Sequence, residues 1–184
     1  MKHFHFFAFF VAIILCNNCS GNKDSIKKLD AELRQFKAKA ITLPTNLLAK
    51  NCEEQVLPDS TLLLRPLKMV VYINQDGCQS CKLRSLLPIY MYILENQYRE
   101  NFGVVIILNT QEIEVAEFTL KEIGFCKTVF FDPDACFERL NPHLPANEQL
   151  HTFLLNNNNK VILVGNPVHN ERLNDLYIKE MNKK

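Results

Sequence analysis

The chain has 184 residues, with 21 basic and 20 acidic side chains and a formal net charge of +1 at pH 7. This balance, with no stripe of basic residues, excludes a nucleic-acid binder that must neutralise several phosphates. We therefore expect no nucleic-acid partner. The length suits one domain of ordinary size with a sufficient hydrophobic core.

Residues 1–18 are predicted to be a lipoprotein signal peptide. The apolar run from Phe4 to Leu15 is too short to span a bilayer securely and has the length of a signal-peptide core. A cysteine directly after such a core resembles a bacterial lipoprotein processing site. Cys19, which follows small Asn18, is the preferred lipidation site, and Cys16 is the alternative. An uncleaved anchor would place the rest of the chain outside the cytoplasm as well.

The predicted location is therefore the bacterial cell envelope, with a lipid anchor in the membrane and the domain in the periplasm or at the cell surface. Residues 19–60 are predicted to form an amphipathic helix over 23–39 and a spacer, because apolar residues recur there at spacings of three and four. Prolines break the stretch that follows, where Thr61 to Leu64 is the best candidate for an extended piece. Residues 61–184 form the predicted main domain.

The pair Cys78 and Cys81 carries the clearest chemical signal. An apolar strand over 68–74 precedes it, and apolar residues at helical spacing follow it, so both cysteines are expected on the first turn of a helix. A helix N-terminus favours an anion, and cysteine pKa values in such settings fall from about 8.5 to roughly 3.5–7.5. Cys78, which we expect to be the more exposed, is the predicted attacking thiolate, and Cys81 is the predicted resolving thiol.

Other uses of this pair stay open. A structural disulfide is one, and half of a zinc site is another, although no second Cys or His pair has the usual spacing. Two thiolates and the imidazole of His151 would suit a soft metal such as copper, but no Met-rich or His-rich segment supports this reading. We therefore expect no metal and no cofactor beyond a redox-active Cys78–Cys81 disulfide.

Strand and helix patterns alternate along the main domain. The predicted strands are 68–74, 104–108, 128–131, 151–155 and 160–165, and the predicted helices are 79–101, 112–123, a short one starting near 132 and a final one carrying Leu173 to Met181. This order predicts an α/β fold with a central mixed sheet flanked by helices and an N-terminal helical extension, because crossovers pair strands in parallel and the closing hairpin adds an antiparallel pair.

The element order, with C-x-x-C at the first strand-to-helix junction, resembles the thioredoxin-like fold over residues 62–184. The segments YINQDGCQSCKL and HTFLLNNNNKVILVGNP are similar to small thioredoxin-like lipoproteins of Bacteroidota, relatives of the TlpA and ResA thiol-disulfide oxidoreductases. The resemblance implies disulfide exchange with disulfide-containing exported proteins. It also implies a membrane or envelope dithiol donor as the source of electrons.

Several positions depart from the family pattern. His151, next to Thr152, stands where the family usually has a cis-proline, and a trans bond is expected there because a cis non-prolyl bond costs about 2.5–4 kcal/mol. An imidazole near the sulfurs could stabilise a thiolate; the alternative is a strand-end histidine without a chemical role. Asp76 is expected to be a solvated turn residue. Pro88 is expected to kink the helix after the motif.

Gln75 stands three residues before Cys78, where peroxiredoxins have threonine, so a peroxidase is disfavoured. If Cys19 is lipidated and Cys16 removed, five cysteines remain, and at least one thiol stays free or pairs with another molecule. A disulfide between Cys126 and Cys136 is disfavoured because they flank a predicted strand. The pairing of Cys52 stays open.

Overall fold

The computed structural model describes residues 25–53 and 60–183, and the predicted signal peptide and lipidation site lie outside these residues. The described residues belong to two compact units, and the boundary in the sequence lies between Phe36 and Lys37. The first unit is helical from residue 25, as the spacing of apolar residues predicted, and carries an ion pair of 2.8 Å between Arg34 and Asp30. Within the described ranges, no helix is both long enough and apolar enough to cross a membrane.

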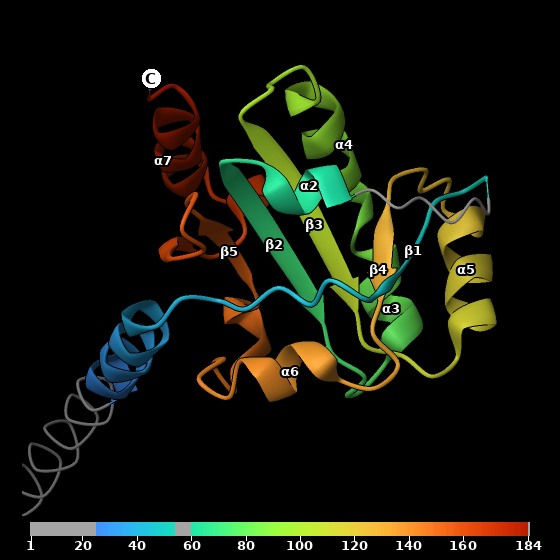
Figure 1. The fold of residues 1–184 in the computed structure, drawn as a ribbon, viewed down its shortest axis with the longest axis horizontal. Coiled ribbons are helices and arrows are strands. Elements are labelled where there is room, and N and C mark those ends of the chain that lie inside the picture. The colour runs from blue at the N-terminus through green and yellow to red at the C-terminus, as the bar shows by residue number, and fades with distance from the viewer. Residues whose placement is uncertain (1–24, 54–59, 184) are drawn as a thin grey trace, which may run out of the picture. The chain divides into compact units, whose positions relative to one another are not determined.

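The second unit is built on a six-stranded mixed sheet in the order β1-β4-β3-β2-β5-β6 (Figure 1). Strands β2, β3 and β4 run parallel, while β1, β5 and β6 are antiparallel to their neighbours. This confirms the predicted α/β class with a central mixed sheet. The strands are β1 Leu48–Lys50, β2 Leu67–Ile73, β3 Phe102–Leu108, β4 Val129–Phe131, β5 Thr152–Leu155 and β6 Val161–Val164.

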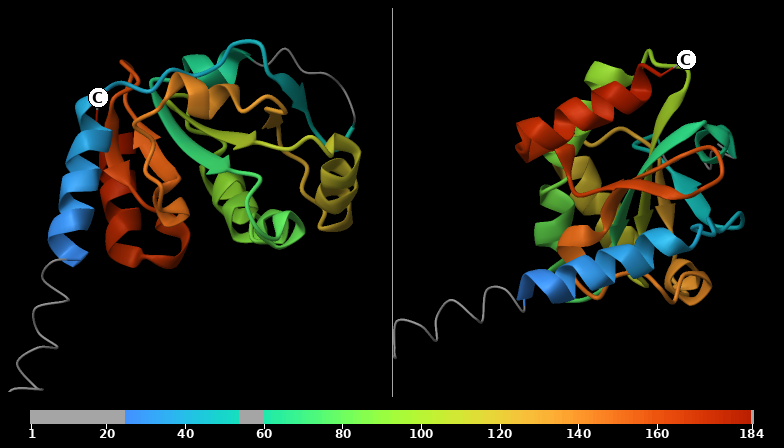
Figure 2. Two further views of the ribbon diagram at one scale, coloured as in Figure 1. Left: turned by 90° about the horizontal axis from the view of Figure 1, so that it is seen from below. Right: turned by 90° about the vertical axis from the view of Figure 1, so that its left-hand side faces the viewer.

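Helices cover both faces of this sheet (Figure 2). One face carries α3, α4, α5 and α7, and the other carries α2 and α6. Because both faces are covered, β3 is buried along its whole length, as expected of a central parallel strand. The helical elements are α2 Ser60–Leu64, α3 Gln79–Arg84, α4 Leu87–Asn96, α5 Ile113–Glu122, α6 Cys136–Leu140, α7 Glu171–Met181 and the 3-10 turns η1 Glu148–Leu150 and η2 Pro167–His169.

The larger core lies between the sheet and the helices α3, α4, α5 and α7. Alternate residues of β2 point into it, because successive side chains of a strand face opposite sides of the sheet. The helices supply apolar partners at helical spacing. The main contributors are Met69, Val71, Ile73, Leu83, Leu86, Ile89, Ile106, Leu120 and Tyr177.

The structure corrects two predicted elements. Thr61 to Leu64, expected to be extended, lies within α2, where leucine's intrinsic preference favours the helix. The strand of this region is instead β1, which pairs with β4, so the sheet includes residues assigned to the spacer. The predicted helix 79–101 is instead two helices, α3 and α4, and the second ends at Asn96. The break lies just before Pro88, because proline lacks an N–H and its ring clashes with the preceding turn.

The turn between β4 and α6 depends on one buried carboxylate. Asp132 is fully buried, and its two oxygens accept the backbone N–H groups of Cys136 and Phe137, each at 2.8 Å. These donors would otherwise be unpaired at the start of the helix. The helix start predicted near Asp132 is therefore confirmed: Ala135 is the N-cap residue of α6, and Asp132 binds the first two N–H groups of the helix.

A disulfide joins Cys52, just after β1, to Cys126, just after α5. Their Cα atoms are 4.7 Å apart although the residues are 74 positions apart in sequence. Cys136 is a free thiol, contacted at 3.1 Å by the guanidinium of Arg139. The structure thus supplies a partner for Cys52 that the sequence could not assign, and the disulfide holds the edge strand β1 near α5.

Removing the Cys52–Cys126 disulfide should lower the free energy of unfolding by about 2–4 kcal/mol, because the bond closes a long loop in the unfolded chain. The double variant Cys52→Ser with Cys126→Ser should show this loss in urea denaturation. Cys136→Ser is the matched control and should stay within about 0.5 kcal/mol of wild type. Equal unfolding midpoints for the double variant and wild type would contradict this role.

Candidate redox site

Cys78 and Cys81 form a disulfide at the start of α3 (Cα atoms 5.3 Å apart). Cys78 is the N-cap residue of α3, and its sulfur accepts the backbone N–H of Cys81 at 3.3 Å. Both residues are exposed. A sulfur that accepts a backbone N–H is better stabilised as a thiolate than as a thiol, which favours Cys78 as the nucleophile after reduction.

The loop between β2 and α3 turns sharply to place the motif. Gly77, directly before Cys78, has a φ of +70°, in the left-handed region where a side chain would be strained. Gln75 and Asp76 are exposed on this loop. The backbone N–H of Asn109 donates to the carbonyl of Ile73 at 2.8 Å, so the ends of β3 and β2 stay together where the motif begins.

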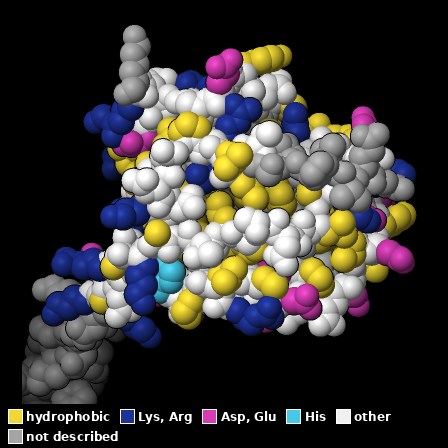
Figure 3. Space-filling view, viewed as in Figure 1, with side chains coloured by type: hydrophobic (Ala, Val, Ile, Leu, Met, Phe, Trp, Pro, Cys, Tyr) yellow, Lys and Arg dark blue, Asp and Glu magenta, His cyan; other side chains and the backbone are white. Residues whose placement is uncertain are grey.

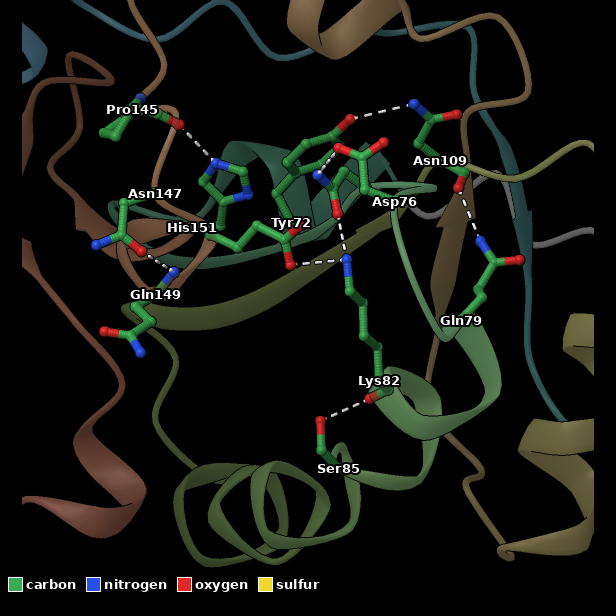
Figure 4. Close-up of polar contacts among 12 residues, drawn as sticks. Tyr72, Asp76, Gln79, Lys82, Ser85, Asn109, Pro145, Asn147, Gln149 and His151 are labelled. Atoms are coloured by element: carbon green, nitrogen blue, oxygen red, sulfur yellow. Dashed lines mark hydrogen bonds and ion pairs between the residues drawn. The ribbon is translucent and has the colours of Figure 1, made fainter.

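Gln79, inside the motif, ties α3 to the end of β3 (Figure 4). Its amide nitrogen donates to the carbonyl of Asn109 at 2.9 Å, and its amide oxygen accepts the hydroxyl of Thr110 at 2.9 Å. Both polar atoms of the Gln79 side chain are therefore hydrogen-bonded to the segment after β3. The sequence holds no signal of this contact, because it joins residues 30 positions apart.

Lys82 connects three segments around the motif (Figure 4). Its ammonium group donates to the side-chain oxygen of Asn74 and forms an ion pair with Glu148 of η1 at 2.7 Å. Asn74 in turn donates to the carboxylate of Asp76 at 2.8 Å. Hydrogen bonds from Lys82, and then from Asn74, hold the pKa of Glu148 below its ordinary value. The segment before β5 is thereby attached to the motif helix.

His151 is buried and lies against Tyr72. Its Nε2 atom donates to the carbonyl of Pro145 at 2.8 Å, and its ring centre lies 5.4 Å from that of Tyr72 (Figure 4). The structure has no cis peptide among the described residues, so the expected trans bond before His151 is found. Thr152 opens β5, where it pairs with Val71.

Tyr72 of β2 is buried and hydrogen-bonded. Its hydroxyl donates to Glu138 at 2.8 Å and accepts the amide of Asn109 at 3.3 Å. Burial raises the pKa of Tyr72 well above its usual value, so the group stays a neutral hydrogen-bond donor. Tyr72 therefore joins α6 to the sheet beside His151.

Two pockets flank the motif. One, of about 510 Å³, borders Cys78 and is walled by α3, the loop after β3 and the start of α5. The other, of about 240 Å³, lies on the opposite side and is lined by Lys82, Glu148 and His151 among others. The Cys78 sulfur thus borders a space that a second molecule can enter.

In the part of the chain that the structure describes, no group of three or more His, Cys, Asp or Glu residues is placed to hold a metal ion. Cys78, Cys81 and His151 do not form such a group. The described arrangement offers two sulfurs in a bond, and the chemistry it can perform is exchange of that bond.

No family model and no curated protein sequence matches this chain. Solved structures do. The thioredoxin domain of a thiol-disulfide oxidoreductase from Bacteroides vulgatus matches with a TM-score of 0.53, covering 77% of this chain and 100% of that chain at 12% identity. The fold is thioredoxin-like.

Two further thioredoxin-like neighbours bear different functional names. A protein named thiol:disulfide interchange protein DsbE, from Chlorobium tepidum, has a TM-score of 0.53 and 19% identity, covering 78% of this chain and 98% of that chain. A mutant of PrxQ from Xylella fastidiosa has a TM-score of 0.52 and 14% identity, covering 77% of this chain and 96% of that chain. At these identities the likeness is one of fold, and function must be argued from the site.

Replacing Lys82 with methionine should raise the pKa of Glu148 toward its ordinary value of about 4.3, because the ammonium group stabilises the carboxylate. Since the native pKa is lowered, the stabilisation by this pair is present above the ordinary pKa and is lost as the pH falls through the lowered value. NMR titration of the Glu148 carboxyl carbon measures the shift. Lys179→Met, on α7, is the control; an unchanged Glu148 pKa in Lys82→Met would refute the link.

Proposed function

We propose that this chain is an exported thiol-disulfide oxidoreductase in which Cys78 attacks and Cys81 resolves. The observation that carries the proposal is an exposed Cys78–Cys81 disulfide at the start of α3, beside an open pocket, in a thioredoxin-like fold. Neighbours named thiol-disulfide oxidoreductases support a redox function in general. We infer no metal and no cofactor in the reaction.

The reaction begins from the reduced protein. The Cys78 thiolate attacks one sulfur of a substrate disulfide, the substrate S–S bond breaks, and one substrate sulfur leaves as a thiolate. The Cys81 thiolate then attacks Cys78 in the mixed disulfide and releases the second substrate sulfur. Two electrons pass to the substrate, whose two thiolates take up the protons that the cysteines lost, and the Cys78–Cys81 disulfide remains.

Each turnover needs a fresh supply of electrons. We propose that a membrane or envelope dithiol reduces Cys78–Cys81 by the same exchange chemistry, and that disulfide-containing exported proteins are the substrates. The steps also run in reverse, in which case the site oxidises substrate dithiols. Direction depends on the potentials of the partners.

The location is part of the same proposal. The apolar run ending at Leu15 and the following cysteines support export and lipidation at Cys19, or at Cys16, with the domain in the periplasm or at the cell surface. An oxidising compartment also suits the Cys52–Cys126 disulfide, since such bonds persist outside the cytosol.

The alternative is a non-enzymatic lipoprotein with a structural Cys78–Cys81 disulfide or with bound copper. The two disulfides differ in a way that weighs against the structural reading. Cys52–Cys126 spans 74 residues and constrains a long loop, whereas Cys78–Cys81 spans three and constrains little of the unfolded chain. A peroxidase lacks support too, because exposed Gln75 replaces the threonine of the peroxiredoxin motif.

A trapping experiment in the native envelope tests the proposal. Cys81→Ser should accumulate mixed disulfides between Cys78 and exported proteins, because the resolving thiol is gone, and mass spectrometry should identify them. The double variant Cys78→Ser with Cys81→Ser is the matched control and should trap nothing. With purified protein, Cys78→Ser should abolish insulin reduction, while Cys136→Ser should retain it.

An empty Cys81→Ser trap, together with wild-type protein that fails to reduce insulin, would refute the exchange function. Copper that co-purifies with wild type and is lost in Cys78→Ser would favour the chaperone alternative.

A further inference from the structure

The pocket beside Cys78 has an apolar wall and an acidic mouth. Leu83 of α3 and Val115 of α5 line it, and Val115 is 57% exposed. Glu112, the N-cap residue of α5, lines the same pocket, and its exposed carboxylate forms no ion pair within the described residues. No described lysine or arginine lines this pocket.

Basic side chains on α3 and α6 are engaged elsewhere in the described structure. Arg84 of α3 pairs with Glu122 of α5 at 3.0 Å. Lys82 lies on the opposite side of the motif, paired with Glu148 and bonded to Asn74. Arg139, on α6, contacts the backbone of Asp134 and the sulfur of Cys136. None of these side chains forms an ion pair with Glu112.

Other acidic side chains without an ion-pair partner in the described structure lie at the same edge of the sheet. The carboxyl ends of the parallel strands β2, β3 and β4 meet there, and the following loops carry Asp76, Glu112 and Asp134. All three are exposed and lack an ion-pair partner within the described residues. Acidic side chains are visible along the lower right of the surface in Figure 3, where α6 and α5 lie in Figure 1. This edge is acidic although the chain as a whole has a net charge of +1.

We propose that the pocket takes a polypeptide segment whose disulfide cysteine is flanked by lysine or arginine, with Glu112 as the main specificity-determining residue. This inference rests on the proposed exchange function. A cationic side chain beside the substrate cysteine meets the Glu112 carboxylate, while its aliphatic stem packs against Val115. An acidic side chain at the same place is repelled.

Three model disulfides test this preference. Each is a peptide dimerised through one cysteine, identical except that lysine, glutamate or serine flanks the cysteine. The dithiol form of the protein is mixed with each in excess, and alkylation followed by mass spectrometry gives the rate of protein oxidation. We expect the lysine peptide to react roughly threefold to tenfold faster than the glutamate peptide at low ionic strength, and less than about twofold faster at high salt.

Variants at one position separate specificity from reactivity. A charge change near Cys78 also alters its thiol pKa, but this affects all three peptides alike, so the ratio of rates is the readout. Glu112→Gln should reduce the ratio and Glu112→Lys should invert it. Glu95→Lys, which makes the same charge change on the exposed surface of α4, is the control and should leave the ratio unchanged.

The failures are distinguishable. If the serine peptide oxidises the protein but the wild-type ratio is near one, or if Glu112→Gln and Glu112→Lys both leave it unchanged, the charge preference is refuted and exchange stands. If no peptide oxidises the reduced protein, the exchange function itself is refuted.

Discussion

The burial of β2 between β3 and β5 is the constraint on which the rest of the site depends. All seven residues of β2 pair with β3, and residues 68–71 also pair with β5, so the strand cannot shift without breaking both ladders. Its carboxyl end therefore delivers Gly77 and Cys78 to a fixed place at the edge of the sheet. The turn at Gly77 then leads into α3, where the backbone N–H of Cys81 donates to the Cys78 sulfur.

Side-chain contacts hold the segments next to the motif, at a place where thioredoxin-like proteins usually have a cis-proline. His151 replaces the usual proline, and a trans bond precedes it. The segment before β5 is held instead by the Lys82–Glu148 ion pair and by the bond from His151 to Pro145. Gln79 fastens the other side of the motif to β3. Because ionic contacts weaken with salt and low pH, this arrangement is more sensitive to conditions than a proline would be.

The sequence was sufficient for those parts of the fold that follow from local pattern. Alternating strands and helices predicted the mixed sheet, and the C-x-x-C spacing placed both cysteines on one helix turn. Pro88 predicted a kink, where the structure ends one helix and begins another. The sequence was insufficient wherever contacts join distant residues. The Cys52–Cys126 disulfide and the Lys82–Glu148 pair each bridge more than 60 positions, and no spacing rule links such residues. The sequence left open whether His151 lies near the sulfurs or has no chemical role, and the structure places its ring against Tyr72.

The central claim is that Cys78–Cys81 is an exchanging couple, whereas Cys52–Cys126 is structural. The most direct test is a redox titration of the purified domain in thiol-disulfide buffers of graded potential, read at each cysteine by differential alkylation and mass spectrometry. The account predicts that Cys78–Cys81 is reduced at a potential above about −300 mV, while Cys52–Cys126 stays oxidised to lower potentials. Reduction of both pairs together, or of Cys78–Cys81 only below about −300 mV, would contradict it.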